Sequence, residues 1–552
     1  MDWKNNQERY SETSGNLLIN RGEMNEILDN CHCSTCGKQL ETEYKRLDMD
    51  FQLTGKCEEC QSENFAIKPQ EIKQSKIRPK TAGLVQSCLD SGIGYAGFKK
   101  IVKGTNLDST ISNRRFDTYA KELHTGMLDM YEAQKPIMNR AVRRQYRKEG
   151  IHVDEDGMLD VAVSYDGSWL TRGHHSNIGA GFVIDSCTGG VLDYEVKSKK
   201  CQKCSLMKHK YRNDEEELVE KLQAHRISGE CHKNYQGSSG GMEKACALDM
   251  WNRSEQTNSM RYTTFISDGD SSAYNAVRDA EPYGPDKPIE KQECINHVSK
   301  RLTARLNNLK QSTTVPKKTK TGKTLNMSTL GGKNKLSEKN VGKLSEYFSN
   351  NIRSNQGKSV ESMKKSIYAS YNHVTSSDDY PMHDDCPEGP ESYCFIKKHE
   401  AAGTDEPPPK HSTMKVRIDL DEDNRNLVRD VYKDLCTNDL LARCLGGKTQ
   451  NPNESFHSKV WNRLPKTKQY SLPTVKNITA RTITEHNLAV QNPNIMDTLG
   501  FDITPSEASQ QVSQFMEKDR SRRSKSHNTK SKTSRRSKGP QHDEDYGAGQ
   551  HD

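Results

Sequence analysis

The spacing of apolar residues divides the chain into segments of different periodicity. Across residues 80–150, apolar residues recur every three or four positions, as at Tyr119, Leu123 and Met127, with basic residues between them. This period is typical of amphipathic helices and predicts a helical module. Its basic face suits contact with DNA phosphates, and an ordinary solvated helix face fits the same pattern.

Near Asp160 short apolar runs bounded by turn residues replace the helical period. Three runs, at about 159–167, 177–185 and 189–198, predict successive strands. A fourth strand is predicted to end at Asp268, before a helix capped by Ser271 or Ser272. A fifth strand then leads into a periodic basic helix. Three strands followed by two strand–helix pairs is the element order of an RNase H-like domain, an α/β fold with a mixed five-stranded sheet.

Three polar segments lack a core-forming pattern. Residues 1–28 are predicted to be disordered, and residues 310–340 are predicted to be a basic linker or surface loop. Residues 506–552 are predicted to be a disordered basic tail, because Lys518 to Lys538 contains ten Lys or Arg residues against one acid. Such a tail suits nuclear targeting or phosphate binding, or is simply solvated.

Composition narrows the class of protein. At 552 residues the chain has room for roughly three or four domains. With 32% hydrophobic and 29% charged residues, it is expected to mix folded domains with polar linkers. It has neither a run of about 18 apolar residues nor an apolar signal core near its start. We therefore expect no membrane partner and a reducing compartment, where its 16 cysteines favour zinc over disulfides.

The first cysteine group predicts a zinc ribbon over residues 29–66. Two Cys-x-x-Cys pairs are separated by 20 residues, a spacing that brings four thiolates to tetrahedral reach. The predicted ligands are Cys33, Cys36, Cys57 and Cys60, and Cys31 could replace Cys33.

A second group follows the third predicted strand. Cys201 and Cys204 form another Cys-x-x-Cys pair, and His225 with Cys231 could complete a tetrahedral zinc site. His232 could replace Cys231 as the fourth ligand. Zinc here would staple an insertion over residues 198–250.

Three acids lie on two predicted strands and a late predicted helix that could converge in the fold. Asp166 lies on the first strand, Asp268 ends the fourth, and Glu454 opens a predicted helix within residues 436–480. Carboxylates that converge from different elements suit two hard cations, Mg²⁺ or Mn²⁺, in phosphodiester cleavage. Spacing alone equally allows three unrelated surface acids.

Several blocks resemble those of Mutator-like DDE transposases, from about Gly92 to Lys466. They include YDGSWLTRGHHSNIGAGFVID, GSSGGMEKACALDMWNRS, FISDGDSSAY, CINHVSKRL and CLGGKTQNPNESFHSKVW. The resemblance implies an RNase H-like catalytic core with a helical insertion, and cut-and-paste DNA transposition. It assigns the catalytic triad to Asp166, Asp268 and Glu454, with Asp270 as a competitor for the second position.

The resemblance also implies a Cys-x-x-His element, matched by Cys294 and His297. With His383 and Cys386 these residues would form a third zinc site, with Cys394 in reserve. A related recombinase of the immune system has a zinc site split across its insertion in a similar way.

The predicted organisation then becomes a catalytic core (158–310), an insertion (311–435) and a closing catalytic helix (436–480). Double-stranded DNA at transposon ends and target is the expected partner, bound by a homo-oligomer in the nucleus. His174 and His175, and Trp461 with Arg463, are either DNA contacts or structural residues. Two alternatives stay open: a domesticated, non-enzymatic DNA-binding or chromatin protein, and a nuclease or recombinase without transposition.

Overall fold

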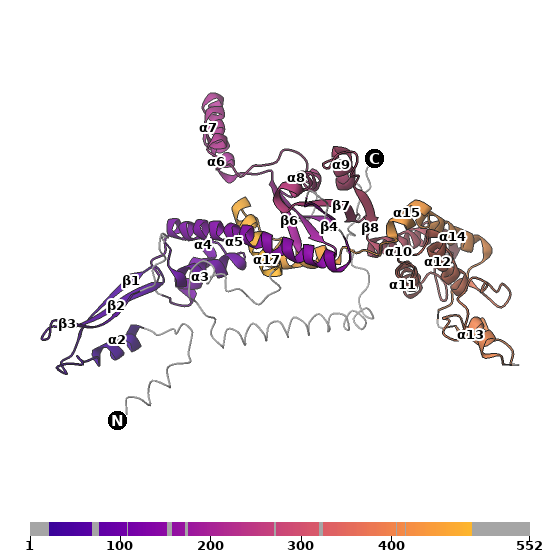
Figure 1. The fold of residues 1–552 in the computed structure, drawn as a ribbon, viewed down its shortest axis with the longest axis horizontal. Coiled ribbons are helices and arrows are strands. Elements are labelled where there is room, and N and C mark those ends of the chain that lie inside the picture. The colour runs from indigo at the N-terminus through magenta and orange to yellow at the C-terminus, as the bar shows by residue number, and fades with distance from the viewer. Residues whose placement is uncertain are drawn as a thin grey trace. The chain divides into compact units, whose positions relative to one another are not determined.

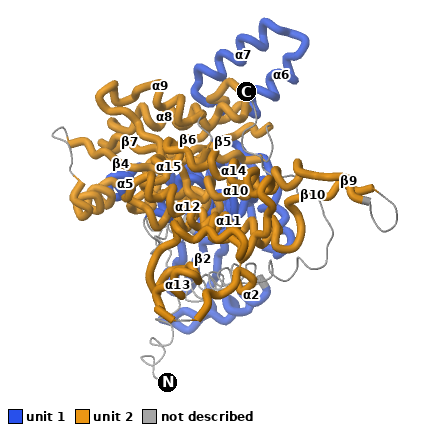
Figure 2. Tube along the Cα trace, turned by 90° about the vertical axis from the view of Figure 1, so that its right-hand side faces the viewer, with its two compact units in different colours: residues 1–138, 201–232, 459–552 blue, residues 139–200, 233–458 orange. Residues whose placement is uncertain are grey.

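The computed structural model describes residues 21–68, 77–107, 109–151, 157–171, 175–269, 272–318, 324–404, 406–414 and 416–487. The chain divides into two compact units (Figure 2). Unit 1 contains residues 1–138, 201–232 and 459–552, and unit 2 contains residues 139–200 and 233–458. The predictions for residues 1–20, for Asp270 and for the basic tail lie outside the described residues.

A small antiparallel sheet in unit 1 occupies the predicted ribbon. Its three strands, in order along the sheet, are β1 (Glu41–Leu47), β2 (Asp50–Cys57) and β3 (Ser62–Ile67) (Figure 1). Helix α2 (Arg21–Asp29) precedes it. This helix corrects the prediction that residues 1–28 are disordered, because Leu28 is buried and gives the short helix an apolar contact.

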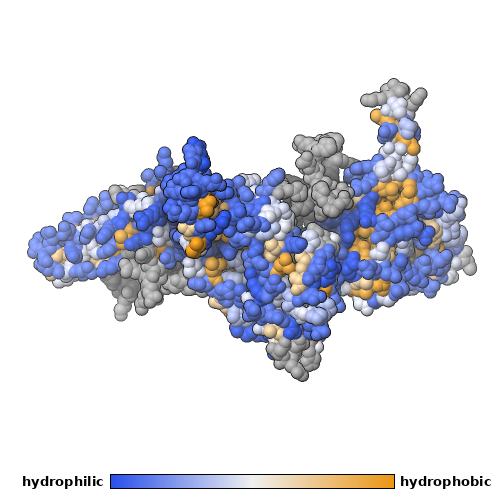
Figure 3. All heavy atoms as spheres, turned by 90° about the horizontal axis from the view of Figure 1, so that it is seen from above, coloured by the Kyte–Doolittle hydropathy of each residue, from blue (hydrophilic) through white to orange (hydrophobic). Residues whose placement is uncertain are grey.

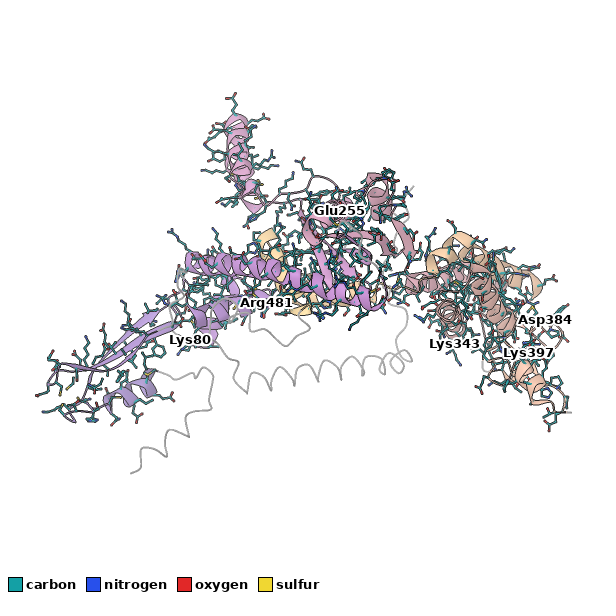
Figure 4. The ribbon with its side chains drawn as sticks, in the orientation of Figure 1. Lys80, Glu255, Lys343, Asp384, Lys397 and Arg481 are labelled. Atoms are coloured by element: carbon teal, nitrogen blue, oxygen red, sulfur yellow. The ribbon has the colours of Figure 1, made fainter. Side chains whose placement is uncertain are left out.

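The helical module forms where the 3.6-residue period predicted it. Tyr119, Leu123 and Met127 are all buried. Its helices are α3 (Pro79–Asp90), α4 (Tyr95–Gly104) and α5 (Asn113–Lys148), the last of which continues into unit 2. Unit 1 also contains α6 (Gln202–Lys210), α7 (Glu215–Ile227) and α17 (Leu472–Asn487). Arg481 of α17, labelled in Figure 4, forms an ion pair with Asp90 of α3 and so ties the two helices together.

A mixed five-stranded sheet forms the centre of unit 2, as predicted. Its order is β6-β5-β4-β7-β8. The first three strands pair antiparallel, whereas β4–β7 and β7–β8 are parallel. The strands are β4 (Leu159–Trp169), β5 (Ile178–Asp185), β6 (Val191–Ser198), β7 (Met260–Ser267) and β8 (Glu290–Glu293).

Helices cover this sheet, and side-chain alternation shows which residues face them. A Cβ on Gly181 would lie 2.9 Å from Cys246 Cβ of α8 (Gly241–Asn258), so this glycine permits close helix packing. The next residue, Phe182, points to the opposite face. There it packs on Phe456 of α16 (Asn451–Arg463), with ring centroids 5.1 Å apart. Helix α9 (Ser272–Ala280) joins β7 to β8.

The segment between β8 and α16 forms its own apolar core. Buried residues include Leu302, Phe348, Ile367 and Tyr432. Its helices are α10 (Ile295–Ser312), α11 (Glu338–Ser354), α12 (Val360–Thr375), α13 (Phe395–Ala402), α14 (Glu422–Leu435) and α15 (Asn438–Cys444), with a 3₁₀ turn at His411–Thr413. We call residues 295–444 the helical insert; it extends beyond the insertion expected at 311–435 by α10 and α15.

The basic loop predicted at residues 310–340 is partly wrong. Strands β9 (Thr314–Lys318) and β10 (Thr324–Ser328) pair as an antiparallel hairpin. Val315, Leu325 and Met327 are exposed, so the hairpin depends on backbone pairing and leaves no buried apolar face for a pattern to reveal.

None of the helices in the described ranges is long and apolar enough to cross a membrane. Hydrophilic residues dominate the face of the molecule drawn in Figure 3, with apolar residues in a few patches.

We predict that Gly181→Ala destabilises unit 2, because the new Cβ would lie 2.6 Å from the Tyr165 hydroxyl. Overpacking of this kind costs about 1–3 kcal/mol, which differential scanning calorimetry would detect as a lower melting temperature. The control is Gly342→Ala on α11, where a Cβ meets nothing within 4 Å and helix propensity favours alanine. Equal effects of the two substitutions would contradict the close α8–sheet packing.

Candidate active site and metal-ligand clusters

Asp166 lies three residues before the end of β4, and Asp268 directly follows β7, the neighbouring parallel strand. The β4–β7 register pairs Ser164 with Ile266, and two further residues along each strand bring Asp166 level with Asp268. Adjacent strands lie about 4.8 Å apart, and residues two apart point to the same face. Both side chains therefore belong to the face of Phe182, which α16 covers, because Asp166 pairs with Phe182 across β4 and β5.

Two amides beside Glu454 attach the start of α16 to the sheet. Gln450 Nε2 donates a 2.8 Å hydrogen bond to the Tyr165 carbonyl of β4. Asn453 Nδ2 donates to the Phe182 carbonyl of β5 at 3.2 Å. Because these bonds are made directly next to Asp166 in the sheet, they hold Glu454 near the ends of β4 and β7.

A fourth acid, Glu243 in the first turn of α8, approaches Asp166 from the opposite face of the sheet, and its charge acts on the Asp166 carboxyl. A Cβ on Gly167 would be 2.5 Å from Glu243 Cγ, so the glycine after Asp166 makes room for this side chain. The sequence patterns did not identify Glu243, and they predicted that the first strand ends near Gly167. The strand instead continues to Trp169, whose indole N–H donates to the Ser239 carbonyl at 2.8 Å.

The charged form of the Asp166 carboxyl is disfavoured in this cluster. Burial raises the pKa of its carboxyl well above the ordinary value of 3.8, and the carboxylates of Glu243, Asp268 and Glu454 raise it further. The side chain is still 35% exposed, so solvent and ions reach it. A hard cation relieves such repulsion, and its preferred ligands are carboxylate oxygens.

Three cationic or ionisable groups surround the acids. His457 Nδ1 lies 3.5 Å from Asp166 Oδ2, and its ring packs on Phe182. His297 Nε2 and Lys300 Nζ lie 3.7 and 3.5 Å from Glu454 Oε1. His457 follows Glu454 by three residues on one helix face, a spacing that could have revealed it in the sequence.

Cys294 and His297 brace the site from the start of α10. The Gln450 backbone N–H donates to Cys294 Sγ at 3.2 Å, and the Ile295 N–H donates to the Lys448 carbonyl at 3.1 Å. Burial alone would raise the pKa of Cys294, but hydrogen bonds from His297 and Gln450 lower it. The same bond to Cys294 raises the pKa of His297. This pair therefore ties α10 to the loop that presents Glu454.

Each of the first two predicted cysteine clusters forms as predicted, and both belong to unit 1. In each, the four ligand atoms lie within 4.8 Å of one another, and each cluster could hold a zinc ion. Cys36 Sγ is 3.5 Å from Cys57 Sγ, and Cys201 Sγ is 3.3 Å from His225 Nε2. Zinc bonds of about 2.0–2.3 Å imply ligand separations of roughly 3.3–3.8 Å. The members are Cys33, Cys36, Cys57 and Cys60 in one cluster, and Cys201, Cys204, His225 and Cys231 in the other.

The third predicted set needs correction. His383 and Cys386 do lie together, but their neighbours are His373 and Cys394. Cys294 and His297 instead contact Gln450 and Glu454, as described above. The Cys-x-x-His spacing left the partners open, and only the packing of α12 against the following loop brings His373 in.

The other residues singled out in the sequence have different environments. His175 is exposed, and His174 lies outside the described residues. Lys466 Nζ lies over the Trp461 ring at 5.1 Å. Arg463 donates to Thr482 at 3.0 Å and forms an ion pair with Glu485, so it braces α16 against α17.

Comparison with known proteins places the chain in a family. The model of the Mutator-like transposase family matches residues 16–394, and the chain belongs to this family. Neither the curated proteins nor the solved structures that were compared gave a match. Family membership indicates a DNA-binding, DNA-modifying enzyme. The matched range contains Asp166, Glu243 and Asp268 but ends before Glu454, which the structure connects to Asp166 and Asp268 through the attachment of α16 to the sheet.

We predict that Asp166→Asn stabilises the metal-free protein at neutral pH. The folded protein holds this proton more tightly than the unfolded chain, so the stability contribution of Asp166 is greatest below pH 3.8 and falls as pH rises above it. The neutral amide removes that loss, and melting curves at pH 7 should shift upward by a few degrees.

The matched control is Asp286→Asn, because Asp286 is an exposed acid outside the cluster. Mn²⁺ should raise the melting temperature of the wild-type protein more than that of Asp166→Asn. A variant less stable than wild type at pH 7 without metal would contradict the repulsion between these carboxylates.

Proposed function

We propose that this protein is a DNA transposase that cleaves and joins phosphodiester bonds by the DDE mechanism. The observation that carries the proposal is the convergence of Asp166, Asp268 and Glu454 on one face of one sheet. They come from two neighbouring strands and one helix that are distant in sequence. Membership in the Mutator-like transposase family supports the same reaction.

The sheet supports the RNase H-like part of the proposal. Numbered by their order in the chain, its strands lie in the sequence 3-2-1-4-5, with only the second strand antiparallel to its neighbours. In this arrangement the first and fourth strands are adjacent and parallel. Asp166 of the first strand and Asp268 just after the fourth are therefore level with each other, as two-metal phosphodiester chemistry requires.

The donor set fits Mg²⁺ or Mn²⁺. Asp166, Asp268 and Glu454 would hold the ions. Two ions bound there would activate the attacking oxygen and stabilise the leaving oxygen of an in-line displacement. His457 and His297 would orient Asp166 and Glu454, and the exposed Lys300 would attract the phosphate backbone of the DNA.

Zinc would have a structural role in the two clusters of unit 1. The ribbon's own core consists of Cys33, Leu40 and Cys57, which is too small to hold three strands without further bonds. The second cluster joins the start of α6 to the end of α7 through Cys201 and His225.

A row of basic residues at the end of α5 supports DNA binding. Arg140, Arg143, Arg144, Arg147 and Lys148 line one hollow of unit 2. Their spacing of three and four residues places the four arginines on one helix face. Arg143 donates to the Ser259 carbonyl at 2.6 Å, which fixes the row against the catalytic sheet at the start of β7.

The remaining parts of the proposal follow from the reaction. Joining two transposon ends to one target would need a homo-oligomer, and the DNA substrate implies that the enzyme acts in the nucleus.

The second candidate is a domesticated, non-enzymatic DNA-binding or chromatin protein. Retained carboxylates with strong mutual repulsion favour the enzyme, because a DNA-binding protein gains nothing from the strain at Asp166.

The decisive experiment incubates the full-length protein with labelled terminal-repeat DNA, target DNA and Mg²⁺ or Mn²⁺. We expect metal-dependent cleavage followed by strand transfer. Asp166→Ala, Asp268→Asn and Glu454→Gln should each reduce both steps by about 10²–10³-fold, the scale of losing one essential electrostatic group. Asp286→Asn, an exposed acid outside the cluster, is the control, and Asp270→Asn tests the competitor for the second position. Binding without cleavage would support the domesticated protein, and cleavage without joining would support a nuclease.

The arginine row generates a separate prediction about binding. Replacing Arg140, Arg144 and Arg147 with Gln should weaken DNA binding uniformly across sequences. It should also reduce the magnitude of the slope of log K against log salt by about 2–3, since each lost phosphate contact contributes about 0.9. The control replaces three lysines of other helices in unit 2, Lys339, Lys343 and Lys433. An unchanged slope in the arginine variant would exclude the row from the DNA interface.

A further inference from the structure

The helical insert contains a buried cluster of two imidazoles and two thiols. His373 comes from the last turn of α12, and Cys394 is the residue before α13. His383 and Cys386 lie in the loop between these helices, the part of unit 2 where Asp384 and Lys397 are labelled in Figure 4. All four side chains are buried, with ligand atoms within 4.8 Å of one another.

The separations between these atoms match the edges of a tetrahedron around zinc. Zinc bonds of about 2.0–2.1 Å to nitrogen and 2.3 Å to sulfur imply edges of about 3.3 Å between nitrogens and 3.6 Å between nitrogen and sulfur. The two Nδ1 atoms of His373 and His383 are 3.3 Å apart. Cys394 Sγ and Cys386 Sγ lie 3.4 and 4.0 Å from His383 Nδ1, and Cys386 Sγ lies 3.7 Å from His373 Nδ1.

A second layer of polar residues surrounds His383. Its other nitrogen, Nε2, is 2.9 Å from His411 Nε2 and 3.1 Å from Ser376 Oγ. His411 Nδ1 is 2.6 Å from Asp378 Oδ1, and the His411 backbone N–H donates to the same oxygen at 2.9 Å. Asp378 therefore acts on the cluster through His411.

This chain of hydrogen bonds determines which nitrogen of His383 carries its proton. Asp378 Oδ1 accepts from both the backbone N–H and the ring Nδ1–H of His411. In this Nδ1–H tautomer of His411, Nε2 is an acceptor, and His383 Nε2–H donates to it directly or through the Ser376 hydroxyl. Either route leaves His383 Nδ1 without a proton and able to bind a metal.

We propose that the helical insert holds a structural zinc ion on His373, His383, Cys386 and Cys394. We further propose that Asp378, acting through His411, keeps His383 in the metal-binding tautomer. Two imidazoles and two thiolates in a closed tetrahedron are typical of structural zinc, because no position stays open for a substrate.

Zinc at this position would fasten the 377–411 segment to α12. The ring of Phe395 packs edge-on against His373, His383 and His411, with centroids 5.4–5.9 Å away, and shields the cluster. The core of α10, α11, α12 and α14 does not include the four ligands. Loss of the metal should therefore release this segment while the core of the insert stays folded.

The test measures zinc content and zinc affinity of the full-length protein. Cys386→Ser combined with Cys394→Ser should remove one zinc ion per chain, by elemental analysis, relative to wild type. Cobalt substitution should show the absorption of a tetrahedral site with two thiolates, and this signal should be lost in the double variant. Cys187→Ser is the control, because Cys187 belongs to none of the three clusters.

Variants of the second layer keep the proposal testable if the cysteine variant fails to fold. Asp378→Ala should lower zinc affinity about 10–100-fold in competition with a chromogenic chelator, the usual effect of losing a partner of a metal-ligating histidine. Asp378→Asn keeps an accepting oxygen and should restore part of the affinity. The neighbouring exposed residue supplies the matched control, Asp379→Ala, which should behave as wild type.

Two results would overturn the proposal. Unchanged zinc content in the double cysteine variant would exclude the site. Equal effects of Asp378→Ala and Asp379→Ala would exclude the route through His411. Because zinc content and affinity are measured without DNA, these outcomes are independent of whether the protein cleaves or joins DNA.

Discussion

Mutual repulsion among carboxylates is the constraint around which unit 2 is organised. Asp166 shares one face of the sheet with Asp268 and Glu454, and Glu243 approaches from the other face. Burial and the charges of these three acids raise the pKa of the Asp166 carboxyl. The acids stay together because they are attached to a rigid framework. Asp166 and Asp268 follow the backbone ladder of β4 and β7, and amide side chains bind the start of α16 to the sheet carbonyls. A folded protein tolerates such strain where a cation completes the site.

The position of Glu454 depends on contacts that cross a long stretch of sequence. Between α10 and α16 the chain folds around its own apolar core, formed by residues of the insert itself. The two ends of this stretch meet where Gln450 binds Cys294 and Ile295 binds Lys448. That closure explains why an insert of this length does not displace the third acid.

The cysteine and histidine clusters belong to segments with little apolar core. The ribbon has a core of three residues, and the loop before α13 depends on imidazoles, thiols and one phenylalanine ring. Where burial of apolar surface is small, metal coordination can supply the free energy that fixes the chain. All three clusters therefore fit a bracing role, separate from the carboxylates of the candidate active site.

Local patterns in the sequence determined the helical module, the five strands and the paired cysteines, because side-chain period and ligand spacing are properties of short segments. Family resemblance, and not spacing, selected Asp166, Asp268 and Glu454 among 75 acids. Tertiary structure alone decided that the charge of Glu243 acts on Asp166, since its place depends on how closely α8 approaches Gly167. It also replaced Cys294 and His297 with His373 and Cys394 in the third cluster. Which residues meet across the insert depends on helix packing, and no local spacing records that packing.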